Sequence, residues 1–269
     1  YHLAAYGKTA VNYNRDVDAF PLLKATWEKM TKGECPSKSP TDMGVNRIGF
    51  GIIDDEVVRE ASKQEVIRRY MRYQCLYMEG AADVDCMSRA KVLMDSLSLK
   101  TEGRLVAGGA RDAAEAARQQ GKGKAGGLIV SAAALQLHNG QIVTGRNSDV
   151  LHACSAVILN AVKLLAGIPD SLPLLAPTIL QSIAHMKRDI LNGGYTSLNL
   201  DEALIALAIS ATTNPAAALA MEKLGELATC EVHMTHMVTP GDEAGLRRLC
   251  CRYTSDPFYA STNLVPGNQ

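Results

Sequence analysis

The chain has 269 residues, of which 47% are hydrophobic, and its 28 Lys and Arg residues balance 28 Asp and Glu residues. This composition is typical of a globular protein of one or two domains with a large buried core. Balanced charge gives no support for non-specific binding to nucleic acid or to an anionic membrane. No run reaches the roughly 18 apolar residues that a transmembrane helix needs. We therefore predict neither a nucleic-acid partner nor a membrane partner.

The seven cysteines are scattered without paired spacing, which is typical of reduced thiols in the cytoplasm. The first residues, YHLAAYGKTAVNYNRD, lack the charged and apolar segments of a signal peptide. They also lack an initiator Met, so we expect the chain to be part of a longer cytoplasmic protein.

Two polar segments near the N-terminus are candidate ligand loops. The first contains Asn12, Asn14, Arg15 and Asp16, and the second, residues 35–46, contains Asp42 and Asn46. The alternative for the first is a surface loop with Asx-type turns. The alternative for the second is that Thr41 or Asp42 caps a short helix.

Helices are predicted over residues 20–30, 54–78, 84–97 and 111–120. Apolar residues of the 54–78 segment recur at helical spacing, and its Arg and Lys residues lie mostly elsewhere. Such a basic face binds phosphate or is merely solvated. The Gly-rich residues 121–127 predict a linker between a mainly helical domain, residues 1–120, and an α/β domain, residues 128–269. Because Gly123-Lys124 is followed by Ala125, this segment does not fit a phosphate-binding P-loop.

Residues 128–167 predict a hairpin that leads into a long helix. Asn139-Gly140 stands between two β-rich runs, and Ser148 is placed to open the helix that carries His152. Further helices are predicted over residues 177–191, after Asn199, after Asn214-Pro215 and over 241–248. Residues 230–239 predict a strand, and residues 249–253 a last strand.

Several of these runs resemble the bacterial domain-of-unknown-function 1846 family, also called uncharacterised protein family 0371. They are YGKTAVNYNRD, SPTDMGVN, EASKQEVIRRY, LHACSAVILNAVKLLAGI, DEALIALAISATTNP and CEVHMTHMV. The resemblance implies that this chain is the C-terminal half of a protein about twice as long, with the absent N-terminal half as its partner. It also singles out Lys63 and Arg69 on the basic helix. The chain departs from the family pattern at Met234 and at Cys251-Arg252-Tyr253.

The hairpin and helix also resemble the cytidine-deaminase-like fold, in which the helix bears His-Ala-Glu. Here the tripeptide is His152-Ala153-Cys154, and the chain has no Cys-x-x-Cys pair. Zinc deaminases need both the Glu and the Cys pair, so we predict no metal site and no zinc-dependent deamination. The fold class expected is α/β (α+β overall), with a helical part followed by a three-layer domain of deaminase-like topology.

A candidate catalytic group is His152 with Ser155. If Ser148 opens the helix, these three residues share a face near the positive end of the helix dipole, where an anion binds well. Thr144 and Asn160 are nearby, and His233 joins the group if its strand is central in the sheet. The structural alternative is that Ser148 is a cap, His152 a hydrogen-bonded core histidine and Ser155 a small packing residue. Cys154 is expected to be a buried, inert thiol.

We therefore expect a protein that binds a phosphorylated or nucleotide-like small molecule. If it is an enzyme, metal-independent group transfer or hydrolysis is favoured, with His152 as general acid and base, Ser155 and Asn160 orienting the ligand, and Arg15 or Lys63 holding an anion. The alternative is a non-catalytic ligand-binding or oligomer-forming scaffold, and a homo-oligomer is expected in either case. The sequence names no cofactor.

Overall fold

The computed structural model describes residues 55–260, with side chains from Glu60 onward, and the chain divides into two units at Arg104 and Leu105. The predicted linker, residues 121–127, therefore lies inside the second unit. The predicted ligand residues of the two N-terminal loops fall outside the described residues: Asn12, Asn14, Arg15, Asp16, Asp42 and Asn46.

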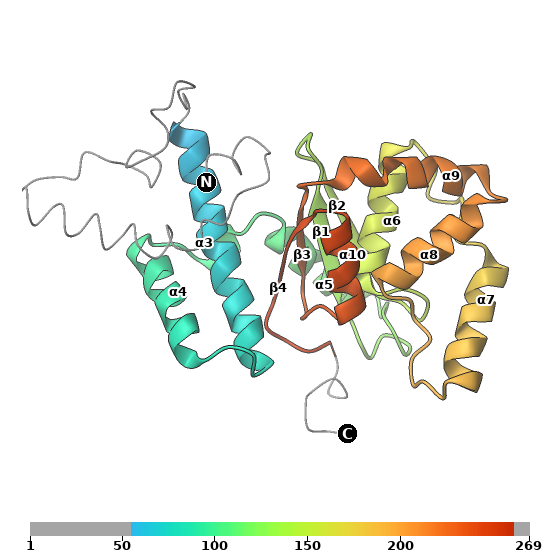
Figure 1. The fold of residues 1–269 in the computed structure, drawn as a ribbon, viewed down its shortest axis with the longest axis horizontal. Helices are drawn as coiled ribbons and strands as arrows, with labels where there is room; N and C mark the ends of the chain where they lie inside the picture. The colour runs from blue at the N-terminus through green and yellow to red at the C-terminus, as the bar shows by residue number, and fades with distance from the viewer. Residues whose placement is uncertain (1–54, 261–269) are drawn as a thin grey trace, which may run out of the picture. The chain divides into compact units, whose positions relative to one another are not determined.

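The described part of the first unit is a pair of helices, α3 (Asp55–Met78) and α4 (Val84–Ser96), followed by the short 3₁₀ turn η3 (Thr101–Gly103) (Figure 1). Buried side chains of α3, among them Ile67 and Met71, pack against Leu93 and Met94 of α4. Gln64 of α3 donates a hydrogen bond to the carbonyl oxygen of Gly103 at 2.8 Å, which ties the turn to the helix.

The second unit is built on one mixed sheet with helices on both faces. The strands are β1 (Ala132–Gln136), β2 (Ile142–Arg146), β3 (Glu231–Met234) and β4 (Arg252–Ser255), in the order β2-β1-β3-β4. β1 is antiparallel to both of its neighbours, and β3 is parallel to β4. The remaining elements are helical: α5 (Ala107–Gln119), α6 (Ala153–Leu165), α7 (Pro177–His185), η4 (Met186–Ile190), α8 (Leu200–Ala211), α9 (Pro215–Glu222), η5 (Lys223–Leu227) and α10 (Pro240–Arg248).

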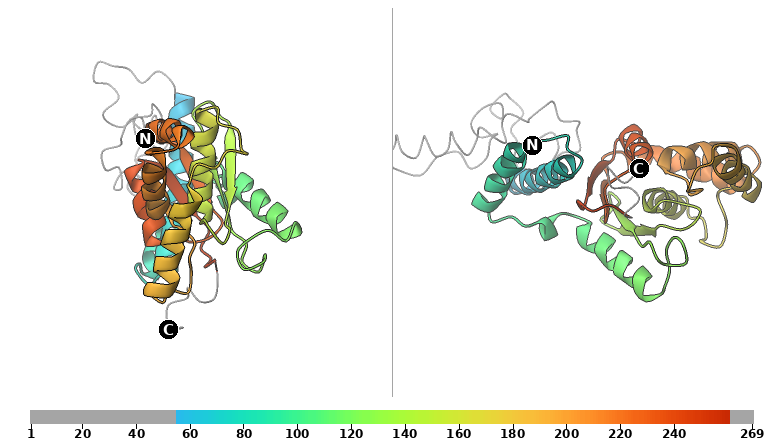
Figure 2. Two further views of the ribbon diagram at one scale, coloured as in Figure 1. Left: turned by 90° about the vertical axis from the view of Figure 1, so that its right-hand side faces the viewer. Right: turned by 90° about the horizontal axis from the view of Figure 1, so that it is seen from below.

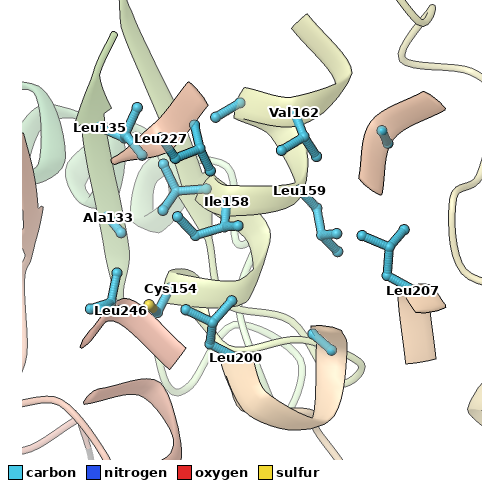
Figure 3. Packing of buried hydrophobic residues seen from close by; sticks show 14 of the residues in the cluster. Ala133, Leu135, Cys154, Ile158, Leu159, Val162, Leu200, Leu207, Leu227 and Leu246 are labelled. Atoms are coloured by element: carbon cyan, nitrogen blue, oxygen red, sulfur yellow. The ribbon is translucent and has the colours of Figure 1, made fainter. Parts of the chain in front are cut away.

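Different helices cover the two faces of the sheet, as the right-hand view of Figure 2 shows. The Ala-rich α5 covers one face, where Ala110 packs against Ala134 of β1. Ala133 and Leu135 point to the other face, into the large core that α6, α8, α9 and α10 share (Figure 3). Because both faces are buried, β1 is almost wholly apolar. The predicted α/β fold is confirmed.

Two glycines shape the predicted hairpin and its helix. Gly140 has φ +85° in the turn between β1 and β2, a conformation that suits the Asn-Gly pair. A Cβ on Gly145 would lie 2.2 Å from the amide nitrogen of Val157, so only glycine lets β2 approach the backbone of α6 this closely.

Three local predictions differ from the structure. α6 begins at Ala153 with His152 as its N-cap, so Ser148 does not open the helix. The hydroxyl of Ser148 instead accepts hydrogen bonds from the amides of Val150 and Leu151, which makes a turn before the helix. β3 ends at Met234, so His236 lies beyond the strand. The 121–127 segment is a small turn in which Lys124 pairs with Ile129 through backbone hydrogen bonds.

Candidate functional site

His152 and Asp242 form a hydrogen-bonded pair at the start of α6. Nδ1 of His152 lies 2.8 Å from Oδ2 of Asp242, and the Asp side chain is completely buried, whereas 23% of the His side chain is exposed. The backbone amide of His152 donates to the carbonyl oxygen of Leu198, which fixes the residue against the segment before α8. The imidazole is thus oriented by a buried carboxylate while one edge stays accessible.

Three groups contact the carboxylate of Asp242. Its Oδ1 accepts from the amide of Leu200 at 2.8 Å, and Oδ2 accepts from the Thr239 hydroxyl at 2.7 Å and pairs with His152. Burial opposes ionisation, but the hydrogen bonds together hold the pKa of Asp242 below its ordinary value. The carboxylate therefore stays ionised beside Nδ1 of His152 and fixes the orientation of the ring.

Three helices begin at this pair. Their N-cap residues are His152 for α6, Asn199 for α8 and Thr239 for α10, and all three line one cavity. The side chains of Asn199 and Thr239 bond to the first turns of their own helices. Within residues 55–260, no side chain caps α6. Its first amides are the orphan donors that an anion commonly satisfies.

Two lysines meet at Ser197 on the wall of the same cavity. Nζ of Lys124 donates to the Ser197 hydroxyl at 2.8 Å, and Nζ of Lys187 donates to the Ser197 carbonyl oxygen at 2.9 Å. The Lys124 ammonium also lies 3.9 Å from the centre of the Tyr195 ring. Lys187 is neutralised by Glu202, at 2.8 Å and 3.0 Å from its two carboxylate oxygens. Lys124 therefore supplies the positive charge that this wall offers.

The pKa of Lys124 is lowered from its ordinary value, as its partly buried position predicts. Burial is the main cause that lowers its pKa, and nearby Lys187 lowers it further, while Asp149 acts in the opposite sense. The carboxylate of Asp149 accepts a hydrogen bond from the amide of Ala125, so it is held by the same turn that presents Lys124. An anion placed against Lys124 would relieve this cost of burial.

His236 forms part of the cavity wall and is only 6% exposed. Its Nδ1 is buried and has no hydrogen-bond partner among the described residues. Burial lowers the pKa of His236 to about 4, opposed by Asp242 and reinforced by His152 and His233. The imidazole is therefore neutral at pH 7.

The cavity has a volume of about 230 Å³. Polar groups from five segments of the chain converge on it: Lys124, Ser131, Asn147, Ser148, His152, Lys187, Ser197, Asn199, His236 and Thr239. Within the described part of the chain, no three His, Cys, Asp or Glu side chains are grouped so as to hold a metal ion.

Of the residues predicted for the second unit, His152 and Ser148 line this cavity and the others do not. Ser155 is fully buried, and its hydroxyl donates to the carbonyl oxygen of Leu198 at 3.0 Å. Asn160 donates to the carbonyl oxygen of Thr144 at 2.9 Å, which joins α6 to β2. These contacts stabilise the start of α6 and its packing on the hairpin.

His233 lies on β3, which is an inner strand as the prediction required, but its side chain is fully buried outside the cavity lining. Nδ1 of His233 lies 2.9 Å from the Thr254 hydroxyl, and Nε2 lies 3.4 Å from Oδ1 of Asp256. Asp256 is in turn held by Arg111 through two hydrogen bonds. His233 thus belongs to a second polar cluster that joins α5, β3 and β4.

Lys63 and Arg69 belong to α3 in the first unit. Nζ of Lys63 lies 3.4 Å from a carboxylate oxygen of Glu60. Arg69 donates to the Tyr73 hydroxyl at 3.4 Å, and its guanidinium lies 5.6 Å from the centre of the Tyr73 ring.

Asp242, Lys124, Lys187 and His236 were not predicted as site residues. Thr239-Pro240-Gly241-Asp242 carries a helix-start signal, but nothing local to it indicates His152 as a partner. The Gly-rich surroundings of Lys124 are typical of a linker, so its place in a folded turn is set by the backbone pairing with Ile129. His236 falls within the predicted strand 230–239, but β3 ends two residues before it.

The second unit therefore belongs to the α/β proteins, and it carries a polar, partly cationic cavity at the meeting point of three helix N-termini. The whole chain belongs to the DUF1846 family: residues 1–98 match its N-terminal domain and residues 102–265 its C-terminal domain, both described as domains of unknown function. The predicted family is confirmed.

The chain is similar to proteins named only "UPF0371 protein" in clostridia. It is 46% identical over 269 residues to one from Clostridium tetani and 46% identical over 268 residues to one from Clostridium botulinum strain Langeland. Each match covers 100% of this chain and 53% of the relative, so the chain spans about half the length of these relatives. None of the described helices combines the length and the apolar character needed to cross a bilayer.

Proposed function

We propose that the second unit binds a phosphorylated small molecule in the cavity lined by His152, Lys124 and Lys187. The observation that carries this proposal is the convergence of three features on one cavity: an oriented imidazole, the uncapped start of α6, and Lys124, which forms no ion pair with a carboxylate of the described residues. Each of these features favours an anion, and phosphate suits all three because it offers several acceptor oxygens.

The balance of charge favours Lys124 as the principal contact. Glu202 already neutralises Lys187, whereas Lys124 bonds to the neutral hydroxyl of Ser197. A phosphate oxygen that replaces Ser197 as acceptor would gain a charge-assisted hydrogen bond, and these are roughly twice as strong as neutral ones. Lys187 would then orient Ser197 through its carbonyl oxygen.

We further propose that His152 acts on this ligand as a general acid and base, in group transfer or hydrolysis that needs no metal. Asp242 fixes the orientation of the ring and stabilises the imidazolium that forms when Nε2 takes a proton. Cys154, the neighbouring potential nucleophile, is excluded from this role because burial raises the pKa of its thiol well above the ordinary value.

The arrangement around α6 supports a nucleotide-like ligand and a deaminase-like topology. The hairpin β1–β2 leads directly to α6, with His152 at its N-cap. In this proposal the His of the deaminase-like element is kept, and Asp242 orients it in place of a bound metal. The protein then works in the cytoplasm, where phosphorylated metabolites are found.

Calorimetric titration of the full chain with inorganic phosphate and with AMP tests the proposal. Lys124→Met should weaken both affinities about tenfold, because one charge-assisted hydrogen bond is lost. Lys223→Met is the matched control, because Lys223 pairs with Glu226 at the surface outside the cavity. Its affinities should equal those of the wild type.

The competing function is a non-catalytic scaffold, in which the His152 pair only stabilises the meeting point of the helices. It is favoured if neither phosphate nor AMP binds to the wild-type chain while His152→Ala lowers the free energy of unfolding by several kcal/mol. Equal affinities in the wild type and in Lys124→Met would likewise contradict binding in this cavity.

A further inference from the structure

The cavity has chemically different ends. Lys124 and Lys187 meet on Ser197 at one of them. His236 belongs to the other, since it also lines an adjoining hollow that neither lysine lines. One end is therefore cationic, and the other is formed by a buried, neutral imidazole.

His236 is the one cavity-lining side chain of the described residues with a buried polar atom that lacks a partner. Thr239 and Asn199 also line the cavity, and their side-chain oxygens accept hydrogen bonds from backbone amides as helix caps. Burying a hydrogen-bonding nitrogen without a partner is costly, so such an atom beside a cavity indicates a partner that arrives with the ligand. A neutral imidazole nitrogen donates or accepts according to the tautomer, and a hydroxyl group can satisfy it in either case.

There is room beyond His236 for the body of a ligand. A second hollow of about 410 Å³ adjoins the cavity and shares Ile129, His236 and Ala260 with it. Leu128 and Phe258, which also line this hollow, are 87% and 64% exposed. A ligand that extends past the imidazole would therefore meet apolar side chains as well as His236.

We propose that the ligand is a phosphate monoester of a hydroxylated molecule, with the phosphate at Lys124 and a hydroxyl group hydrogen-bonded to the imidazole of His236. This inference rests on the proposed phosphate site and adds the class of molecule that the site selects. His236 is the residue that determines this specificity. A site built to bond a hydroxyl discriminates against an analogue that lacks it, because the polar group of the protein is then left unpaired.

The test compares phosphate esters that differ in their hydroxyl groups, by calorimetric titration of the full chain. The probes are ribose 5-phosphate, glucose 6-phosphate and glycerol phosphate, with ethyl phosphate as the ester that has no hydroxyl. At least one hydroxylated ester should bind about tenfold more tightly than ethyl phosphate. His236→Phe should abolish this preference, so that the hydroxylated esters and ethyl phosphate bind with equal affinity.

Two further variants complete the design. His185→Phe removes an exposed imidazole that pairs with Asp189 outside the cavity, and it should keep the preference. His236→Gln supplies a neutral hydrogen-bonding amide, so it should keep part of the preference and serves in place of His236→Phe if that variant does not fold.

The outcomes separate this inference from the proposed function. If no phosphate compound binds, the phosphate site itself is refuted. If all the esters bind with equal affinity, the phosphate site stands and the role of His236 is refuted. A preference for a hydroxylated ester that survives in both His236 variants also overturns the role of His236.

Discussion

His152 and Asp242 are 90 positions apart in the chain, yet Nδ1 of one lies 2.8 Å from Oδ2 of the other. The contact joins the N-terminus of α6 to the N-terminus of α10, and through the Leu200 amide it reaches the first turn of α8. One buried carboxylate thus orients the imidazole and also holds three helices together. The proposed function and the stability of the fold are therefore coupled at Asp242.

Removal of this carboxylate should destabilise the fold. We expect Asp242→Ala to lower the free energy of unfolding by about 3–5 kcal/mol, since it leaves the Leu200 amide and His152 without their buried acceptor. Urea unfolding followed by circular dichroism measures the change. Asp189→Ala is the control, because Asp189 forms its ion pairs at the surface, and its effect should stay within about 0.5 kcal/mol. Equal effects of the two substitutions would contradict the assigned role of Asp242.

The buried His236 should make stability depend on pH. Burial lowers its pKa from 6.5 to about 4, so the unfolded chain binds a proton more readily than the folded chain between these values. Stability is therefore lost as pH falls from about 6.5 to about 4, by roughly 3 kcal/mol if this group acts alone. Urea unfolding at pH 7 and pH 4 should show this loss in the wild type and a loss smaller by that amount in His236→Gln. Identical pH dependence in the two proteins would show that His236 is not buried in its neutral form.

Asp256 and its partners His233 and Arg111 should make stability depend on pH in a more acidic range than His236 does. Although burial opposes ionisation of Asp256, hydrogen bonds from His233 and Arg111 lower its pKa from 3.8 to about 2. A carboxyl group with a lowered pKa contributes stability above its unfolded value, and that contribution is lost as pH falls from about 4 to about 2. We expect roughly 1–2 kcal/mol after allowance for solvent screening at the partly exposed Arg111.

The variant Asp256→Asn isolates this contribution. Its free energy of unfolding should be lower than that of the wild type at pH 5, and the difference should shrink towards pH 2. Asp112→Asn, an exposed change on α5, should leave the curve unaltered. A constant difference between wild type and Asp256→Asn over this range would argue against the ionised pair with Arg111.

The contact between β2 and α6 predicts a severe effect of one methyl group. In Gly145→Ala the new Cβ would meet the backbone at Val157 rather than a movable side chain, so the strand or the helix must shift. We expect a loss of about 3 kcal/mol or more, observed as a lower Tm in thermal unfolding. Gly194→Ala is the matched control, since a Cβ there meets nothing within 4 Å. A small effect at Gly145 would mean that α6 packs less closely on the hairpin.

The sequence predicts the elements of this fold better than it predicts the site. Periodic patterns and capping residues locate α3, α6 and α8, and Asn139-Gly140 locates the hairpin, because these signals are local. Ser148 is an exception, since it has the chemistry of a helix cap but caps a turn. The backbone pairing of Leu151 with Leu198 keeps the chain extended until His152, the N-cap of α6.

The site depends on distant pairs that local patterns do not show. The position of His152 after the hairpin makes it a candidate, but the packing of α10 brings Asp242 to it, and the fold brings Lys187 and the turn with Lys124 to the wall of the cavity. Ser155 and Asn160 carry suitable groups at suitable spacing, yet backbone carbonyl groups take their hydrogen bonds. Spacing along one helix therefore predicts which residues share a face and leaves open whether that face meets a cavity.

Hydrogen–deuterium exchange with and without inorganic phosphate tests most directly whether the cavity holds the anion. We predict slower exchange, at saturating phosphate, in the peptides that contain Ala153, Ser197 and Lys124, and loss of this protection in Lys124→Met. Protection confined to peptides of α3, with its basic face, and absent around Ala153 would contradict this prediction.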